Sequence, residues 1–324
     1  MSDKNATAVV LANDEGIAKA ARILADGGLV AVPTETVYGL AARADSAEAV
    51  ARIYAAKGRP SFNPLIVHVR DLEQAKRYAR FPYYAHHLAG TQWPGPLTLV
   101  LPRRENTGLA EAVMAGLPTL ALRVPAHPVM QAVLAAVDFP LAAPSANRSG
   151  FISPTTADHV LTSLKGRIDL VLDAGPTSEG VESTILAVRE DDSWEELRPG
   201  PLDPRWLNLD YKGKDQSSEA HSKIEAPGQL ASHYAPGKPV RLDAGWAAPD
   251  EYWIGFGAIA GDCTLSASGN VNEAAARLFA CLHEGALASH PRIAVAPVPE
   301  KGVGRAINDR LRRAATPADQ AGPD

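Results

Sequence analysis

The chain has 324 residues, of which 46% are hydrophobic and 21% charged, and its formal net charge is −5. This length predicts two domains, and the mildly acidic balance argues against nucleic-acid binding through overall basic charge. No segment is long and apolar enough for a membrane span, and none has the pattern of a leader. We therefore expect a soluble cytoplasmic protein with no membrane partner. Cys263 and Cys281 lie outside any CxxC pair and predict neither a disulfide framework nor a zinc site.

Through about residue 210, short apolar runs alternate with amphipathic segments, which is typical of a single α/β domain. Helices are expected from Asn13 or Asp14 to about 26, from Asp45 to 57, over 129–136, and from Thr155 or Thr156 to 164. Strands are expected over 29–32, 65–69, 97–101, 119–125, 141–143 and 170–173, from 182 onwards and up to 198.

The remaining chain changes character after residue 210. Residues 211–238 form a predicted linker, polar from Lys212 to Ser222. Its second half carries His233 and Tyr234 between prolines, which suggests a segment that docks onto a surface. A smaller α/β domain is expected over 239–324, with strands near 240, 252–256 and 293–296 and helices near 272–284 and 304–314.

The stretch from Lys57 to His68 crowds two cations, a hydroxyl and an amide between two prolines. Pro60 and Pro64 bias the preceding residues, Arg59 and Asn63, toward extended backbone, so the loop can hold its cations at a fixed place. Taken alone, the stretch fits equally a helix C-terminus that ends at Gly58. Later segments favour a binding site.

Other polar groups follow predicted strands. The segment 33–40, with two threonines, a carboxylate and a phenol, suits a ligand-facing loop or an ordinary turn. Arg123, near the end of an apolar strand, needs either an internal acid or a ligand carboxylate as its partner, and we favour the ligand. His68 is a lone strand-end histidine of the kind that is more often structural. Residues 144–150 are small and hydroxylated, which allows close approach of a phosphate.

Together these segments give the first domain cations, hydroxyls and amides but no outstanding Ser–His–Asp triad and no nucleophilic cysteine. The set comprises Lys57, Arg59, Arg123, Arg198, Thr34, Thr36, Ser145, Ser183, Asn63, Asn147 and His68. Such a set predicts a site that binds polyanions and a small zwitterion, and that works by positioning and electrostatics.

Over nearly its whole length the chain closely resembles the long, two-domain form of the YrdC-type threonylcarbamoyl-AMP synthase family. The resemblance rests on the segments 33–40, 57–60, 63–65, 144–147, 183–185, 198–200, 233–236 and 309–315. One departure is Gln229, where the family's linker motif usually has Met. The resemblance implies an α/β fold, with a YrdC-like twisted mixed sheet flanked by helices and a smaller C-terminal Rossmann-like domain.

The resemblance also implies a reaction. L-Threonine, bicarbonate and ATP would give threonylcarbamoyl-adenylate and pyrophosphate, as expected of a nucleotidyltransferase. The product would serve the modification of the adenosine next to the anticodon in tRNA, so tRNA or proteins that accept the adenylate are expected partners. Mg²⁺ would accompany ATP without a dedicated metal site.

Residue roles are implied position by position. The expected catalytic residues are Lys57, Arg59, Ser145 and Asn147. The expected threonine-binding residues are Thr36, His68, Arg123, Ala143 and Ser183. The expected ATP-binding residues are Arg59, Asn63, Thr119, Ser145, Ser153, Arg198 and Tyr234, the last closing over the adenylate from the linker.

Two other functions are alternatives to the enzyme. A non-catalytic RNA-binding protein of the same fold would use a concave basic surface. A carbamoyl-transferring hydrogenase-maturation factor would be longer and would carry zinc-finger cysteines. The basic end of the chain (Lys301, Arg305, Arg310, Arg312 and Arg313) could contact tRNA or a partner protein, although a solvated helix face is the favoured interpretation.

Overall fold

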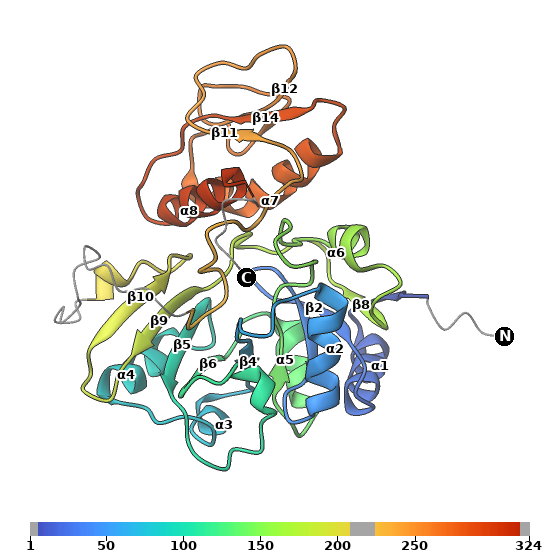
Figure 1. Cartoon of the computed structure of the whole chain (residues 1–324), viewed down its shortest axis with the longest axis vertical. Helices are drawn as coiled ribbons and strands as arrows, with labels where there is room; N and C mark the ends of the chain where they lie inside the picture. The colour runs from blue at the N-terminus through green and yellow to red at the C-terminus, as the bar shows by residue number, and fades with distance from the viewer. Residues whose placement is uncertain (1–5, 208–223, 318–324) are drawn as a thin grey trace.

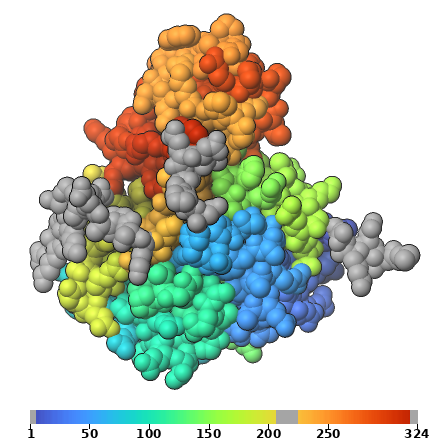
Figure 2. Space-filling model, viewed as in Figure 1, coloured from blue at the N-terminus to red at the C-terminus, as the bar shows by residue number. Residues whose placement is uncertain are grey.

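The computed structural model describes residues 6–207 and 224–317. Within these ranges the chain forms a larger domain with a mixed sheet and a smaller domain with a parallel sheet, which confirms the predicted fold class (Figure 1). Figure 2 shows the smaller domain as a separate lobe seated on the larger one. The predicted linker 211–238 begins outside the described residues, so its boundaries stay a prediction.

The larger domain contains ten strands among the described residues. They are β1 (Ala8–Leu11), β2 (Val30–Pro33), β3 (Tyr38–Arg43), β4 (Ile66–His68), β5 (Leu97–Pro102), β6 (Thr119–Arg123), β7 (Leu141–Ala142), β8 (Leu170–Asp173), β9 (Thr184–Val188) and β10 (Trp194–Arg198). Their order in the sheet is β1-β8-β2-β3-β7-β4-β6-β5-β9-β10, with parallel and antiparallel neighbours. The helices are α1 (Asp14–Ala25), α2 (Ala47–Lys57), α3 (Leu72–Ala75), α4 (Tyr83–Gln92), α5 (Pro128–Ala135) and α6 (Ala157–Leu164).

The smaller domain is built on four parallel strands, in the order β11-β14-β12-β13. Its elements are β11 (Val240–Arg241), β12 (Glu251–Gly255), β13 (Cys263–Thr264), α7 (Val271–Leu287), β14 (Arg292–Val295) and α8 (Gly304–Ala315). Helices α7 and α8 pack together on the side that faces the larger domain (Figure 1).

Local sequence signals set several helix ends as predicted. Asn13 caps α1 by accepting a hydrogen bond from Gly16 N, and Thr156 caps α6 in the same way. The predicted start of α2 at Asp45 was wrong by one residue, because the Ser46 hydroxyl is the cap while Asp45 pairs with Arg43. Gly58 ends α2 with a φ of 60°, a conformation that glycine adopts without strain.

Strand β3 was not predicted, and one further expectation is wrong. Strands β2 and β3 pair antiparallel, so residues 34–37 of the segment 33–40 form the expected turn between them. Cys263 and Cys281 form a disulfide with their Cα atoms 6.0 Å apart. Their separation along the chain gave no sign of this, since only the packing of α7 against β13 brings the two together.

The two faces of the large sheet are covered differently. Helices α2, α4 and α6 cover one face along most of its width, and α1 and α5 cover the other face over β2, β3 and β8. Side chains alternate along a strand, so Ile66 and His68 share a face with Ala121 and Arg123, away from α2. This part of the sheet is covered instead by the segment 226–234, which crosses it (Figure 1). The fold thus leaves a roofed space over β4, β5, β6 and β9.

The two domains share a hydrophobic core. Val37, Ile152 and Val181 of the larger domain pack in the same buried cluster as Phe279 of α7, and Tyr234 joins them. Among the described residues, no helix has the length and apolar character needed to cross a membrane.

Candidate active site

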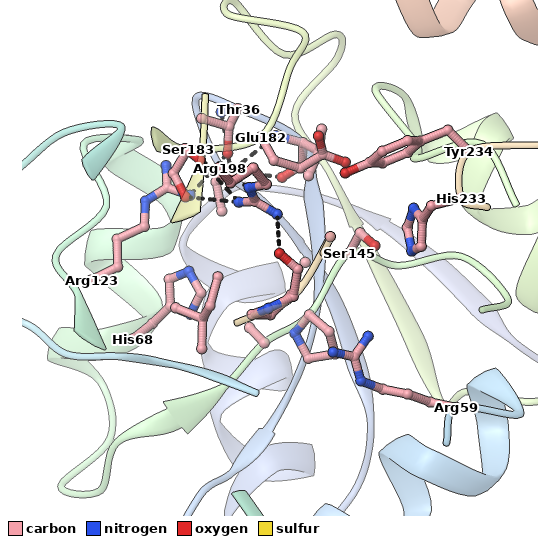
Figure 3. Close-up of a pocket in the computed structure, with 18 residues that line it drawn as sticks. Thr36, Arg59, His68, Arg123, Ser145, Glu182, Ser183, Arg198, His233 and Tyr234 are labelled. Atoms are coloured by element: carbon pink, nitrogen blue, oxygen red, sulfur yellow. Dashed lines mark hydrogen bonds between the residues drawn. The ribbon is translucent and has the colours of Figure 1, made fainter. Parts of the chain in front are cut away.

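A cavity lies over the free part of the sheet, between the strand ends, the loop after β7 and the segment 226–234 (Figure 3). Predicted site residues that line it are Thr36, Arg59, His68, Arg123, Ala143, Ser145, Ser183, Arg198 and Tyr234. In Figure 3 Arg123 and His68 lie on one side and Tyr234 and His233 on the other. The structure therefore brings most of the predicted residues to one place.

Arg123 is buried at the end of β6 and is paired within the protein. Its guanidinium lies 2.7 Å from the Glu35 carboxylate and donates a hydrogen bond of 3.0 Å to the Thr36 hydroxyl. Burial would raise the pKa of Glu35, but Arg123, together with backbone hydrogen bonds, more than offsets this effect, so the pKa lies below its usual range. The sequence favours a ligand carboxylate as the partner of Arg123, whereas in this structure its partner is the other alternative, the internal acid Glu35.

His68 faces the cavity beside Arg123 as an uncharged ring. Burial, and then the nearby Arg123 charge, lower its pKa to about 3. Its Nδ1 atom is buried and has no hydrogen-bond partner among the described residues. The ring can therefore bind a polar group of a ligand without bringing charge.

Arg59 and Arg198 bring positive charge to the cavity. Arg59 donates hydrogen bonds to the Asn63 side chain and to the Pro64 carbonyl oxygen, at 2.6 and 2.8 Å. Arg198 donates to the Ser183 carbonyl and hydroxyl oxygens at 3.0 and 3.2 Å. These acceptors are neutral, and burial lowers the pKa of Arg59 to about 10, so both guanidiniums stay charged near neutral pH.

Lys57 does not line the cavity. It is buried at the last position of α2, and its ammonium donates hydrogen bonds to the carbonyl oxygens of Ser145 and Asn147. Burial, and then Arg59, lower the pKa of Lys57 well below its ordinary value. In this structure Lys57 supports the loop whose other side carries Ser145 into the cavity.

Four other predicted residues also lie behind or outside the cavity wall. Asn63 accepts from Arg59, and Ser153 donates to the Glu182 carboxylate. The Asn147 amide donates to two backbone oxygens of its own loop. Thr119 begins β6, at the opposite end of the strand from Arg123, and does not line the cavity. Its role in ATP binding stays a prediction without a contact to support it.

The segment 226–234 forms the roof. The Pro227 carbonyl oxygen accepts from Arg198, and a methyl group on Gly228 would lie 2.9 Å from Arg198 Cδ and 3.1 Å from the Tyr234 hydroxyl. The Tyr234 hydroxyl is buried with no hydrogen-bond partner in the described part of the chain, and burial raises its pKa to about 12. Gln229, the departure from the family motif, accepts from the backbone of Glu225 and Ala226 and so braces the roof.

The sequence did not indicate the ion pairs of two acids of the site, Glu35 and Glu182, or the part that Arg310 takes in one of them. Glu182 lines the cavity and forms an ion pair of 3.0 Å with Arg310 of α8. Both acids lie in segments that carried the family resemblance or adjoin it, but their partners come from distant parts of the chain. No group of three or more metal-binding side chains occurs among the described residues.

Comparison with known proteins places this geometry in a family. The profile of the Sua5_yciO_yrdC family, described as telomere recombination, matches residues 22–200. The profile described as the C-terminal domain of threonylcarbamoyl-AMP synthase matches residues 193–316. A threonylcarbamoyl-AMP synthase of Bacillus subtilis is 39% identical, over 94% of both chains. The chain belongs to the threonylcarbamoyl-AMP synthase family.

A second relative and a solved structure are similar to this chain over most of its length. The threonylcarbamoyl-AMP synthase of Pyrococcus abyssi is 38% identical over 91% of this chain and 93% of its own. The crystal structure of P. abyssi Sua5 complexed with L-threonine has a TM-score of 0.85 and 35% identity, and covers 96% of this chain and 97% of that chain. The similarity thus includes both domains.

Proposed function

We propose that this protein synthesises L-threonylcarbamoyladenylate from L-threonine, bicarbonate and ATP and releases pyrophosphate. The observation that carries the proposal is the pair Arg59 and Arg198, which lie in one roofed cavity. Among the described residues, the hydrogen bonds of both guanidiniums go to neutral oxygens. A polyphosphate is the ligand that such a pair fits best.

The chemistry requires no nucleophile from the protein. The unprotonated amine of threonine takes up bicarbonate with loss of water, which gives a carbamate. A carbamate oxygen then attacks the α-phosphorus of ATP, and the bond to the bridging oxygen of pyrophosphate breaks. Because negative charge grows on the leaving pyrophosphate, fixed cations lower the barrier.

The residues that line the cavity supply positioning for this reaction. Arg123, with Thr36, would hold the carboxylate of threonine, and the neutral His68 ring would accept a hydrogen bond from its amine or hydroxyl group. Arg59 and Arg198 would hold the phosphates, with Mg²⁺ arriving on ATP. Tyr234 in the roof would keep water from the mixed anhydride until it is released.

The adenylate would be consumed by a transfer of the threonylcarbamoyl group to the adenosine next to the anticodon of tRNA. tRNA, or a protein that accepts the adenylate, would collect it.

The test is pyrophosphate release by the purified full chain with ATP and bicarbonate, with L-threonine added, omitted or replaced by L-serine. We expect release that depends on both threonine and bicarbonate and that is slower with serine. Release independent of threonine would contradict the reaction. Absence of release from folded protein, together with binding of structured RNA, would support the RNA-binding alternative.

A further inference from the structure

Arg310 is the largest fully buried side chain of the described structure, although it lies in a basic run that we expected to be a solvated helix face. That expectation was wrong for this residue, whereas the neighbouring Arg312 is exposed. Burying a guanidinium is unfavourable unless it is paired and hydrogen-bonded, so its contacts indicate why it is there.

The contacts of Arg310 reach out of its own domain. Its guanidinium donates to the Glu182 carboxylate at 3.0 Å and to the Pro199 carbonyl oxygen at 2.8 Å, both in the larger domain. It also lies 5.6 Å from the centre of the Tyr234 ring, within the range of a cation–π contact. Arg310 therefore contacts one wall of the cavity, at Glu182, and the roof, at Tyr234, from outside.

Glu182 is the reason why this contact matters for the reaction. It lines the cavity near Arg198, and its second carboxylate oxygen accepts from Ser153. Burial opposes its ionisation, but Arg310, then Arg198, keep its pKa at about 2, so Glu182 is charged. An unpaired carboxylate at this place would repel a polyphosphate.

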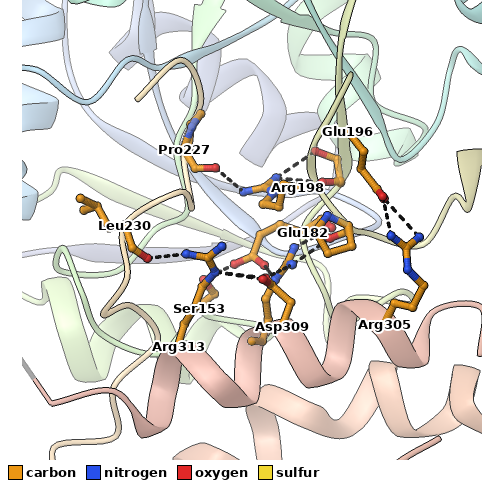
Figure 4. A network of polar contacts seen from close by, with 12 residues as sticks. Ser153, Glu182, Glu196, Arg198, Pro227, Leu230, Arg305, Asp309 and Arg313 are labelled. Atoms are coloured by element: carbon orange, nitrogen blue, oxygen red, sulfur yellow. Dashed lines mark hydrogen bonds and ion pairs between the residues drawn. The ribbon is translucent and has the colours of Figure 1, made fainter. Parts of the chain in front are cut away.

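Two neighbouring arginines of α8 make other contacts. Arg305 pairs with Glu196 of the larger domain, which does not line the cavity, whereas Arg313 donates to the Leu230 carbonyl oxygen of the roof (Figure 4). Arg305 thus makes an ion pair across the same domain boundary and from the same helix, which makes it a matched control for Arg310.

We propose that Arg310 is a positioning residue through which the smaller domain completes the active site, by neutralising Glu182 and holding Tyr234 over the cavity. The inference rests on the proposed function only in taking ATP as the ligand. It gives the smaller domain a defined part in nucleotide binding.

The test is calorimetric titration of the full chain with MgATP, alongside threonine-dependent pyrophosphate release. Arg310→Met should weaken ATP binding about tenfold or more, because the Glu182 carboxylate is left unpaired beside the phosphates. The double variant Arg310→Met, Glu182→Gln should recover ATP affinity to within about threefold, because the cavity then has no unpaired carboxylate. Asp309, the other acid paired with Arg310, lies outside the cavity lining and keeps its ion pair with Arg313. Arg305→Met should leave the affinity unchanged within about twofold.

Thermal melting of each variant shows whether it is folded, so a loss of ATP binding can be distinguished from a loss of folded protein. If Arg310→Met does not fold, Arg310→Lys, which keeps the charge, is compared with the double variant, and both should bind ATP. Equal ATP affinity of Arg310→Met and the parent, an equal loss in Arg305→Met, or failure of Glu182→Gln to restore binding would each overturn the proposal. An inactive parent that binds ATP would contradict the proposed reaction but not the role of Arg310.

Discussion

At the scale of single residues, the site is a set of buried charges that are either paired inside the protein or free to meet a ligand. Arg123 is paired with Glu35, whereas Arg59 and Arg198 are held by neutral oxygens. A threonine carboxylate would therefore have to share Arg123 with Glu35, while phosphates would meet two arginines whose hydrogen bonds, in the described residues, go to neutral oxygens.

The first prediction concerns threonine binding. The double variant Arg123→Met, Glu35→Gln leaves no buried charge unpaired, and it should raise the KM for threonine about a hundredfold, the effect of losing a charge-assisted bidentate contact. The KM for ATP should change by less than about threefold. Steady-state pyrophosphate release measures both constants, and Arg103→Met, which breaks an exposed ion pair, is the control. An unchanged threonine KM would remove Arg123 from the site.

The second prediction concerns Lys57, which the sequence indicated as catalytic and which the structure places behind the loop of Ser145. Lys57→Ala should lower kcat/KM about a hundredfold or more, because the loop loses its buried support. The exposed Lys76→Ala is the control, and pyrophosphate release is the measurement. Near-normal kinetics in a folded Lys57→Ala protein would contradict any role in catalysis.

At the scale of elements, strands and helices with strong local signals were predictable, and short or composite ones were not. Strand β8 and the helix caps at Asn13 and Thr156 were predicted from local patterns. Strand β3 was interpreted as a loop because its glycine and tyrosine follow a threonine-rich turn. The two-residue strand β13 carries too little sequence to indicate anything by itself.

The residues of the site also divide into those that were predictable from the sequence and those that were not. Residues such as Arg198 and Ser145 lie in segments with a recognisable order of residue types, so they could be named. Glu182 and Arg310 form a pair between distant segments, and neither partner indicates the other along the chain. The solvated interpretation failed at Arg310 because an arginine that pairs across a domain boundary has the same local sequence as an arginine in water.

The third prediction concerns the roof. Gly228 and Gly237 both have positive φ values, 85° and 76°, but only at Gly228 would a Cβ clash, with Arg198 and Tyr234. Both alanine variants should cost about 1 kcal/mol of unfolding free energy from backbone strain. Gly228→Ala should in addition lower activity about tenfold, because the segment 226–234 can no longer pack closely against Arg198. Denaturant titration and pyrophosphate release measure the two effects, and equal activity losses would refute the role of the close approach.

At the scale of the whole molecule, burial of neutral histidines sets a pH dependence of stability. Burial is the first cause that lowers the pKa of His68, His233 and His283 to about 3, from an ordinary value of 6.5. Between these values the unfolded chain binds more protons than the folded one, so stability is lost as the pH falls below 6.5. Glu182, with a pKa of about 2 against an ordinary 4.5, adds its own loss only below 4.5.

The fourth prediction follows from this window. Between about pH 6.5 and 4.5 the free energy of unfolding should fall by up to about 1.4 kcal/mol per pH unit for each of the three histidines. His283→Gln should remove one such contribution from the slope, and the exposed His86→Gln should not. Urea titrations across the window measure it, and identical slopes in the parent and His283→Gln would contradict the prediction.

The apolar contact between the two domains has a consequence for attempts to separate them. Val37, Ile152 and Val181 are buried against the smaller domain, so a shortened chain that ends before it would present these three side chains to water. A minimal enzyme obtained by deletion would therefore need a resurfaced patch at these positions, and the redesign is constrained because Val37 also lines the cavity. At the domain interface, Ile152 and Val181 can be replaced by polar residues, whereas Val37 has to be retained.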